Sequence, residues 1–493
     1  MDMILDKSEI NCRREIWYGT VRREEMAECV VPDTCPDFVQ AALHCAQSVI
    51  RGKSAANGKV TVEAAVLCTA LCLAESAPEL YRMDLEVPFV LTAEVPEADE
   101  DTDIIAALEL ENTEIRLPNP RKLMARAELC VQLRCFNGDM LTVSCTAQAE
   151  PGLQLLEKSC VAVTVTDVCE KTFAISDELA LPPTEGEYTR ILCQHVELKA
   201  DDVKFVGKRL IFKGEIRIQL LLEHENSPWP ICVNTSSSFS QLIELSEEAE
   251  NAELTLCLTG AYFDLAENDS GKKIVSAEIH ILAQAAAFTS REMSYIADAY
   301  SNAAECTVSV TACCVPQART ETVLRETYCG TAEAEAAEQI LCAAADCTSA
   351  AADTNGVTAA VRIQCLYRGA DGMMHSAVHS GSLQIAAELP AGPCCVLLHC
   401  GEVYAVPSAG GIDLRVPVEA KLLFNSSMEV NCVTGITLTE QTERPERPSI
   451  YLIPTPENAQ LWELAKKYGS TVQLIESQNP EIKDVLLIPG QRM

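Results

Sequence analysis

The sequence has few aromatic residues, few basic residues and no long apolar run. Phe, Trp and Tyr make up 5% of its 493 residues, so Ala, Leu, Val and Cys must fill much of any hydrophobic core. Lys and Arg number 38 against 72 Asp and Glu, which gives a formal net charge of -34. A field of this sign repels phosphate backbones and anionic lipids, so we expect no nucleic-acid partner. No stretch of 18 consecutive apolar residues occurs, and we therefore expect no membrane insertion.

Two further absences concern targeting and cysteine chemistry. The first seven residues, Met-Asp-Met-Ile-Leu-Asp-Lys, carry acidic groups where a signal peptide has a basic and then an apolar segment. We therefore expect a cytoplasmic protein. The 25 cysteines include no Cys-x-x-Cys, which excludes the thioredoxin-like motif and the common half-site for zinc. The adjacent pairs Cys313-Cys314 and Cys394-Cys395 could still cross-link chains after oxidation.

What the sequence does contain is a repeat. Residues 216–222 read IRIQLLL and residues 361–367 read VRIQCLY, with a weaker copy, VLCTALC, at 66–72. In each copy an apolar residue downstream is followed five positions later by glutamate; the pairs are Phe89 and Glu94, Phe239 and Glu244, and Leu383 and Glu388. Offsets that hold over several segments indicate three related units, each of about 140 to 150 residues.

The cysteines fit this repeat as core residues. Cys68 occupies the place of Ile218 and Ile363, Cys72 that of Leu222, and Cys365 that of Leu220. A reduced cysteine packs like a small hydrophobe, so we expect these three to be buried.

The alternation of apolar and polar residues in the repeats predicts strands. The predicted fold is mainly β, with three tandem β-rich repeat domains of sandwich or barrel-like packing. Their expected bounds are 1–172, 173–313 and 314–439, followed by a Pro- and Glu-rich linker at 440–449 and a separate module at 450–493. We also expect a short helix in each domain, at 38–49, 188–195 and 332–345.

The last 44 residues have a distinct pattern. Residues 450–453 read as a strand, and the run LWELAKKY at 461–468 places Leu461, Ala465 and Tyr468 on one helical face. Gly469 is placed to end that helix, a second helix begins near Thr471, and residues 485–488 return as a strand. The expected order is βααβ.

This order, together with LWELAKKYG, an Asn-Pro-x-Ile segment and a final IPGQ, resembles a LysM domain. The resemblance implies binding through two loops to N-acetylglucosamine-containing glycan, such as peptidoglycan, or to a protein partner. The implied binding residues are Pro456, Glu457, Asn458, Ala459, Gln478, Asn479, Pro480, Glu481 and Ile482. The family usually has Gly-Asp-Thr in the first loop, and this chain lacks that glycine, so a protein-binding LysM fits at least as well.

The upstream units carry further motifs, GKVTV at 58–62 and Pro88-Phe89, and a LysM-like end follows them. In this combination the chain resembles the SPOCS-domain proteins of Clostridia-like spore formers. The resemblance implies a spore coat morphogenetic protein, made in the mother cell and recruited to the forespore surface, where it engages another spore coat protein or peptidoglycan. The expected function is thus a non-enzymatic structural and interaction role. The alternative is a peptidoglycan-binding cell-wall protein.

The sequence motifs that could indicate a catalytic, phosphate-binding or metal site are less specific than these resemblances. Gly52-Lys53-Ser54 matches only the end of a phosphate-binding loop, because position 47 is Gln. A zinc site built from His375, His379 and the cysteines after them is conceivable, but its spacing matches no familiar site. The acidic run at 94–103 suits a solvated loop better than a calcium site. We expect no enzymatic activity, no catalytic residues, no metal and no cofactor, although a site assembled between repeats remains a third possibility.

Overall fold

The computed structural model describes residues 1–74, 77–183, 187–268, 271–390, 394–440, 448–454, 460–480 and 485–490, and these residues are mainly in strands, as predicted. The first repeat contains β1 (Leu5–Val30), β2 (Phe38–Ala56), β3 (Lys59–Ala74), β4 (Ala77–Glu94), β5 (Asp103–Asn119) and β6 (Lys122–Ala147). The second contains β7 (Leu153–Ala180), β8 (Tyr188–Phe205), β9 (Arg209–His224), β10 (Ser227–Glu244), β11 (Asn251–Glu267) and β12 (Lys273–Ser301). The third contains β13 (Glu305–Ala332), β14 (Ala337–Asp353), β15 (Gly356–Gly369), β16 (Met374–Ala386), β17 (Cys394–Cys400), β18 (Tyr404–Ser408) and β19 (Gly411–Thr439). The tail contains β20 (Ile450–Pro454), α1 (Leu461–Tyr468), α2 (Val472–Gln478) and β21 (Val485–Pro489).

The three repeats, units 1, 2 and 3, have the same antiparallel plan. Each has a three-stranded sheet, ordered β2-β3-β4, β8-β9-β10 or β14-β15-β16. In each unit the first and last strands pair with each other, and the last strand also pairs with a shorter fifth element, which unit 3 splits into β17 and β18. The segments around Cys68, Ile218 and Ile363 lie on β3, β9 and β15, the central strands.

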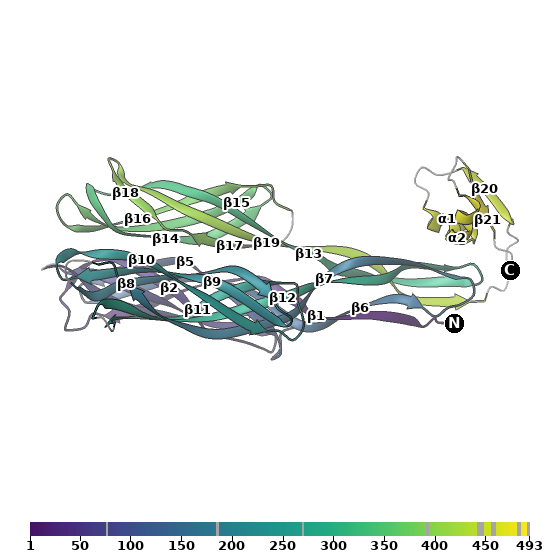
Figure 1. Ribbon diagram of the computed structural model, residues 1–493, viewed down its shortest axis with the longest axis horizontal. Coiled ribbons are helices and arrows are strands. Elements are labelled where there is room, and N and C mark those ends of the chain that lie inside the picture. The colour runs from purple at the N-terminus through teal and green to yellow at the C-terminus, as the bar shows by residue number, and fades with distance from the viewer. Residues whose placement is uncertain are drawn as a thin grey trace.

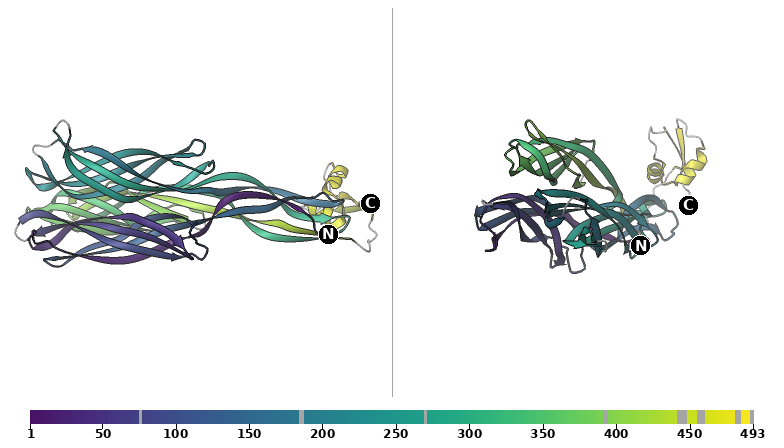
Figure 2. Two further views of the ribbon diagram at one scale, coloured as in Figure 1. Left: turned by 90° about the horizontal axis from the view of Figure 1, so that it is seen from below. Right: turned by 60° about the vertical axis from the view of Figure 1, so that its left-hand side comes forward.

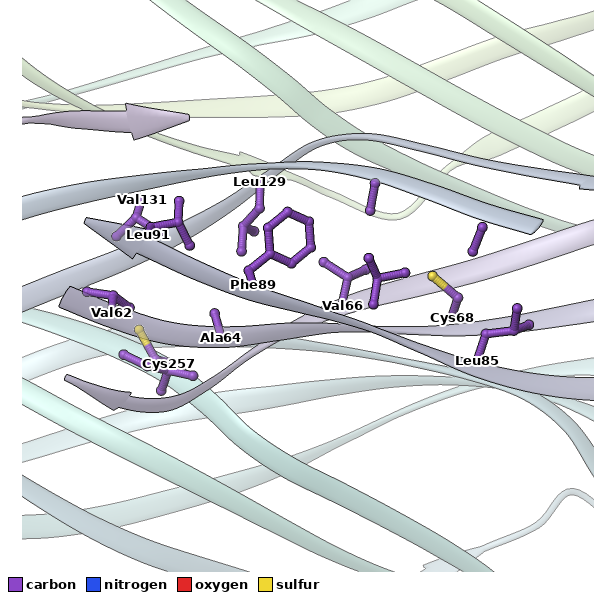
Figure 3. Packing of buried hydrophobic residues seen from close by; sticks show 14 of the residues in the cluster. Val62, Ala64, Val66, Cys68, Leu85, Phe89, Leu91, Leu129, Val131 and Cys257 are labelled. Carbon is purple, nitrogen blue, oxygen red and sulfur yellow. The ribbon is translucent and has the colours of Figure 1, made fainter. Parts of the chain in front are cut away.

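A separate core fills the space between the two layers of each unit. In unit 1, alternate residues of β3 and β4, including Val66 and Phe89, pack against Leu129 of β6 (Figure 3). Full burial of such a side chain contributes about 1.5–3 kcal/mol. Cys68 and Cys72 belong to this core, and Cys365 to that of unit 3, so the prediction that these cysteines act as core residues is confirmed.

Strand bounds place the divisions between units earlier than the sequence analysis did. Units 1 and 2 are separated by residues 148–152, and units 2 and 3 by residues 302–304, whereas we expected new units at 173 and 314. The expected divisions fall inside β7 and β13, each of which has 28 residues. No turn signal marks those positions, because the strand continues through them.

The first and last strands of every unit extend beyond the body and form a stalk, defined as residues 5–15, 137–147, 153–165, 288–301, 305–316 and 427–439. Figure 1 shows these segments narrowing toward one tip, where the N-terminus lies. Two small apolar clusters, with members from all three units, fill the stalk between its strands. Its narrowness follows from the fact that only two strands per unit reach this far.

A β-bulge lies at the same place in each unit, where the body passes into the stalk. The unpaired residues are Ile16, Thr166 and Gln317, at offsets of 150 and 151 residues. A bulge bends its strand and increases the local twist. We therefore expect the paired first and last strands of all three units to bend where the body passes into the stalk.

A second set of bulges lies where the units meet. Strands β2, β8 and β14 each have three register shifts, and the middle one leaves Ala42, Leu192 or Leu341 unpaired. All three residues are buried in one apolar cluster, which we call the junction. Figure 2 shows the units lying side by side along the length of the molecule. The bulges turn these side chains away from their own cores and toward the neighbouring units.

The repeated Arg-Ile-Gln motif contributes to the same contact between units. Gln219 of unit 2 donates a hydrogen bond to the Ala343 carbonyl of unit 3 at 3.2 Å, and its counterpart Gln364 lies 3.4 Å from the His44 ring nitrogen of unit 1. Unit 1 has Thr69 in the motif, and Gln47 supplies its link by donating to the Val196 carbonyl at 2.6 Å. Each unit thus contacts the next in a cyclic order.

The prediction of a helix in each of the three repeats was wrong. Residues 38–49 lie in β2 and residues 188–195 in β8, while 332–345 spans the end of β13 and the start of β14. In β2, Phe38 faces the core of its own unit, whereas Ala42 and Leu43 face the junction. Because both faces are apolar and a bulge interrupts the alternation, the spacing resembles that of a helix.

The tail module follows linker residues that mostly lie outside the described part of the chain. Strands β20 and β21 pair antiparallel, and α1 and α2 lie between them in sequence. Gly469 ends α1 in the left-handed conformation with φ 67°, as predicted, and the Thr471 hydroxyl accepts a hydrogen bond from the Leu474 amide at the start of α2. Neither of these helices, the two within the described residues, is long and apolar enough to cross a membrane.

Candidate functional site

The tail module rests on the tip of the stalk through one face of α1. Its core, built on Ala465, Ile475 and Ile488, also includes Tyr300 of β12. The Tyr300 ring meets the Trp462 ring edge-on, with centroids 4.8 Å apart, and its hydroxyl donates to the Ser470 carbonyl at 2.9 Å. The module and the stalk therefore share one apolar contact.

Asp298 is the polar centre of this contact. Its carboxylate accepts a hydrogen bond from the Trp462 indole at 2.8 Å and forms an ion pair with Lys466 Nζ at 2.6 Å. Burial acts to raise the pKa of Asp298, but hydrogen bonds from Lys466 and Trp462 outweigh it and hold the pKa below its ordinary value. The carboxylate is thus charged at neutral pH and attracts α1.

A bulge in β12 directs these residues toward the module. Ala297 is unpaired, and Ile296 before it and Ala299 after it both belong to the stalk interior. In an unbroken strand, residues 296 and 299 would face opposite sides. The bulge restores the inward direction at Ala299 and places Asp298 and Tyr300 on the outer side. Sequence analysis missed these two residues, because nothing in the alternation marks the bulge.

Of the implied ligand residues, three lie within the described part of the chain. Gln478 and Pro480 are exposed. The Asn479 side chain instead joins α2 to β21, since it donates to the Ile475 and Leu487 carbonyls and accepts from the Leu487 amide at 2.8 Å. Pro456, Glu457, Asn458, Ala459, Glu481 and Ile482 lie outside the described residues.

The outer face of the β20-β21 sheet is apolar and open to solvent. Ile450, Leu452 and Val485 are 56%, 69% and 51% exposed, although the alternate residues of the same strands are packed against the helices. Two paired strands with an apolar outer side are costly to leave uncovered, so this face suits contact with another protein.

A cavity of about 830 Å³ lies between the three units and is lined mainly by the edge strands β2, β5, β8, β11, β14 and β17, with further residues from β9 and β10. Glu197 of unit 2 lies 3.5 Å from the His399 ring nitrogen of unit 3 and 3.6 Å from Arg217 of its own unit. Burial, aided by the charge of Glu111 and opposed by Arg22, raises the pKa of Glu109 in the lining to about 7. The contact between Glu197 and His399 joins units 2 and 3.

The remaining sequence candidates are separate from one another and bound to structural partners. His375 pairs with Asp371 at 2.8 Å, whereas His379 binds the Tyr328 hydroxyl at 2.6 Å. Within the described residues, no three metal-binding side chains gather, so the conceivable zinc site is not formed there. Lys53 extends from unit 1 into unit 2, where its ammonium meets Gln284 at 2.6 Å and Glu170 at 2.7 Å.

The glutamates that recur in each unit also have a structural place. Glu94 forms an ion pair with Lys59 at 3.1 Å, and Glu244 with Arg209 at 3.9 Å. In both cases the basic residue is the first residue of the central strand and lies directly opposite the glutamate. Both pairs are exposed, and such pairs contribute little to stability. They mark the ends of equivalent strands.

Comparison of the chain with protein-family models, with curated proteins and with solved structures found no match.

Proposed function

We propose that this chain is a non-enzymatic structural protein of the spore coat. In this proposal the three SPOCS-like units form an elongated scaffold, and the LysM-like tail module recruits it from the mother-cell cytoplasm to the forespore surface by binding another coat protein. The single observation that carries the proposal is the position of the tail module, which is presented at the far end of the stalk with an apolar strand face exposed.

The attachment of the module supports a protein partner. Its α1 face is occupied by Asp298 and Tyr300 of the stalk, so Trp462 is not available to a ligand in this arrangement. The side that remains open is the β20-β21 face with Ile450, Leu452 and Val485. An apolar strand face without exposed aromatic rings suits a protein surface better than a sugar, which binds through hydrogen bonds and ring stacking.

Localisation of fluorescently tagged protein in sporulating cells tests the proposal. Deleting residues 449–493 should abolish placement at the forespore and leave the three units folded. The double variant Leu452→Asp, Val485→Asp should have the same effect, because it adds two charges to the apolar face. A matched control, Gln473→Asp with Ser477→Asp, puts the same charges on the exposed side of α2 and should localise normally. Normal placement of the truncated protein would refute the proposal.

The alternative function is binding of peptidoglycan by the tail module. It rests on the exposed Gln478 and Pro480 in the loop that the LysM resemblance assigns to glycan. In that case purified peptidoglycan should retain the full-length protein, and Gln478→Ala should weaken retention while Leu452→Asp should not. Asn479 is a poor test residue, because its amide holds α2 to β21 and its loss would disturb the module itself.

A further inference from the structure

Cysteines lie at repeat-equivalent positions in the junction between units. Cys193 on β8 faces Leu221 of β9, and Cys342 on β14 faces Leu366 of β15, each directly after a bulged leucine. Both are buried in the junction. The corresponding residue of unit 1 is Leu43, opposite Leu71, so only units 2 and 3 carry a thiol at this position.

The first of these cysteines is already joined to the preceding unit. Cys193 of unit 2 forms a disulfide with Cys45 of unit 1, which lies on β2 two residues beyond Leu43. Within the described residues, the same two units share one strand pair, between Arg13 and Val165.

The second cysteine has a thiol of the preceding unit beside it. The Cys342 Sγ atom lies 3.7 Å from the Cys232 Sγ atom on β10 of unit 2. A disulfide needs the two sulfur atoms about 2.05 Å apart, so these two would have to approach each other by about 1.7 Å. Cys342 thus lies beside a cysteine of the preceding unit, as Cys193 does.

We propose that Cys232 and Cys342 form a second disulfide between units, so that a small-molecule disulfide oxidant such as oxidised glutathione joins units 1, 2 and 3 covalently in chain order. The Cys232 thiolate attacks one sulfur of the oxidant, which releases one thiol and leaves a mixed disulfide on Cys232. The Cys342 thiol then loses its proton and attacks Cys232 Sγ, which releases the second thiol. The two protein thiols are oxidised by two electrons, and the oxidant disulfide is reduced to two thiols.

The surroundings of the two cysteines favour this order of steps. Cys232 is partly exposed, whereas Cys342 is buried. The contact with Cys342 lowers the pKa of Cys232, and the same contact together with burial raises the pKa of Cys342. The thiolate forms more readily at the accessible sulfur, which is the one that must meet the oxidant first.

Disulfide mapping of the full-length protein tests the proposal. Reduced protein is incubated with oxidised glutathione, remaining thiols are alkylated, and peptides are identified by mass spectrometry after digestion without reductant. We expect two linked peptides between units, Cys45 with Cys193 and Cys232 with Cys342. Cys347 and Cys400 of unit 3, whose sulfur atoms lie 2.7 Å apart, provide an internal reference for the oxidant.

Two serine variants make the result specific. Cys232→Ser should lose the linked peptide completely and leave Cys342 alkylated, whereas Cys314→Ser, at an exposed thiol of the stalk, should leave the link intact. Oxidised wild-type protein should also unfold at higher urea concentration than oxidised Cys232→Ser. Alkylation of both Cys232 and Cys342 in oxidised, folded wild-type protein would overturn the proposal, as would a link from Cys342 to any other cysteine. The readout is intramolecular and does not depend on the tail module or on its partner.

Discussion

Replacing Asp298 should release the tail module from the stalk. The Asp298 carboxylate accepts hydrogen bonds from Trp462 and Lys466, and its side chain is 23% exposed. A hydrogen bond to a charged group contributes about 1.5–3 kcal/mol, and partial exposure reduces this. We therefore expect Asp298→Ala to weaken docking by about 2–3 kcal/mol, a factor of about 30 to 150 in the equilibrium between docked and free module.

Fluorine NMR of protein containing 5-fluorotryptophan measures this directly, because the chain has only 3 tryptophans and Trp462 lies in the contact. In Asp298→Ala the Trp462 resonance should move toward the position of a solvent-exposed indole. Asp298→Asn retains an acceptor for the indole and should give an intermediate shift. Glu463→Ala, on the exposed side of the same helix, should leave the resonance unchanged. An unshifted Trp462 signal in Asp298→Ala would refute this account of how the module is held.

Three further predictions concern the body. The pKa of Glu109 is about 7 in the folded protein, against an ordinary pKa of 4.5. The folded state therefore loses stability as pH rises from 4.5 to 7, because the unfolded state releases this proton first. Urea titrations should show Glu109→Gln gaining up to about 3 kcal/mol over wild type between pH 4.5 and 8, and an equal difference at both pH values would contradict this. Arg134 neutralises Glu15 and Glu253 at the contact between units 1 and 2, so Arg134→Met should lower the free energy of unfolding by about 3–5 kcal/mol; a loss below 1 kcal/mol would show that the cluster matters little. A methyl group on Gly214 would meet the Lys199 carbonyl and the Phe239 ring at 2.4 Å, so Gly214→Ala should cost about 1–3 kcal/mol by the same titration, whereas Gly410→Ala, which meets nothing within 4 Å, should be neutral; equal stability of both variants would contradict the close contact.

The sequence allowed the β content, the equivalent central strands and the two short helices of the tail to be predicted, because these depend on local alternation and helix capping. The Arg-Ile-Gln copies at 217–219 and 362–364 do lie on equivalent strands, β9 and β15. Ala465, the buried residue of α1, and the terminal Gly469 were likewise visible in the spacing.

What escaped prediction depends on bulges and on contacts between units. The bulges at Ala42, Leu192 and Leu341 shift the alternation by one residue, so strands that are apolar on both faces were read as helices. The stalk was missed because its strands continue without any turn signal past the end of the body. Asp298 and Tyr300 have a role only once the fold brings the tail, some 160 residues further along the chain, against β12.

The cyclic contacts between units bear on how such a chain could arise. Each unit begins and ends at the stalk tip. Among the described residues the named strands pair within one unit, apart from the Arg13–Val165 bridge, and at the tip Asp2 of unit 1 also pairs with Thr437 of unit 3. A single unit therefore carries both halves of the contact that it makes with its neighbours. The arrangement resembles that of a homotrimer whose subunits are joined by two short connections, residues 148–152 and 302–304.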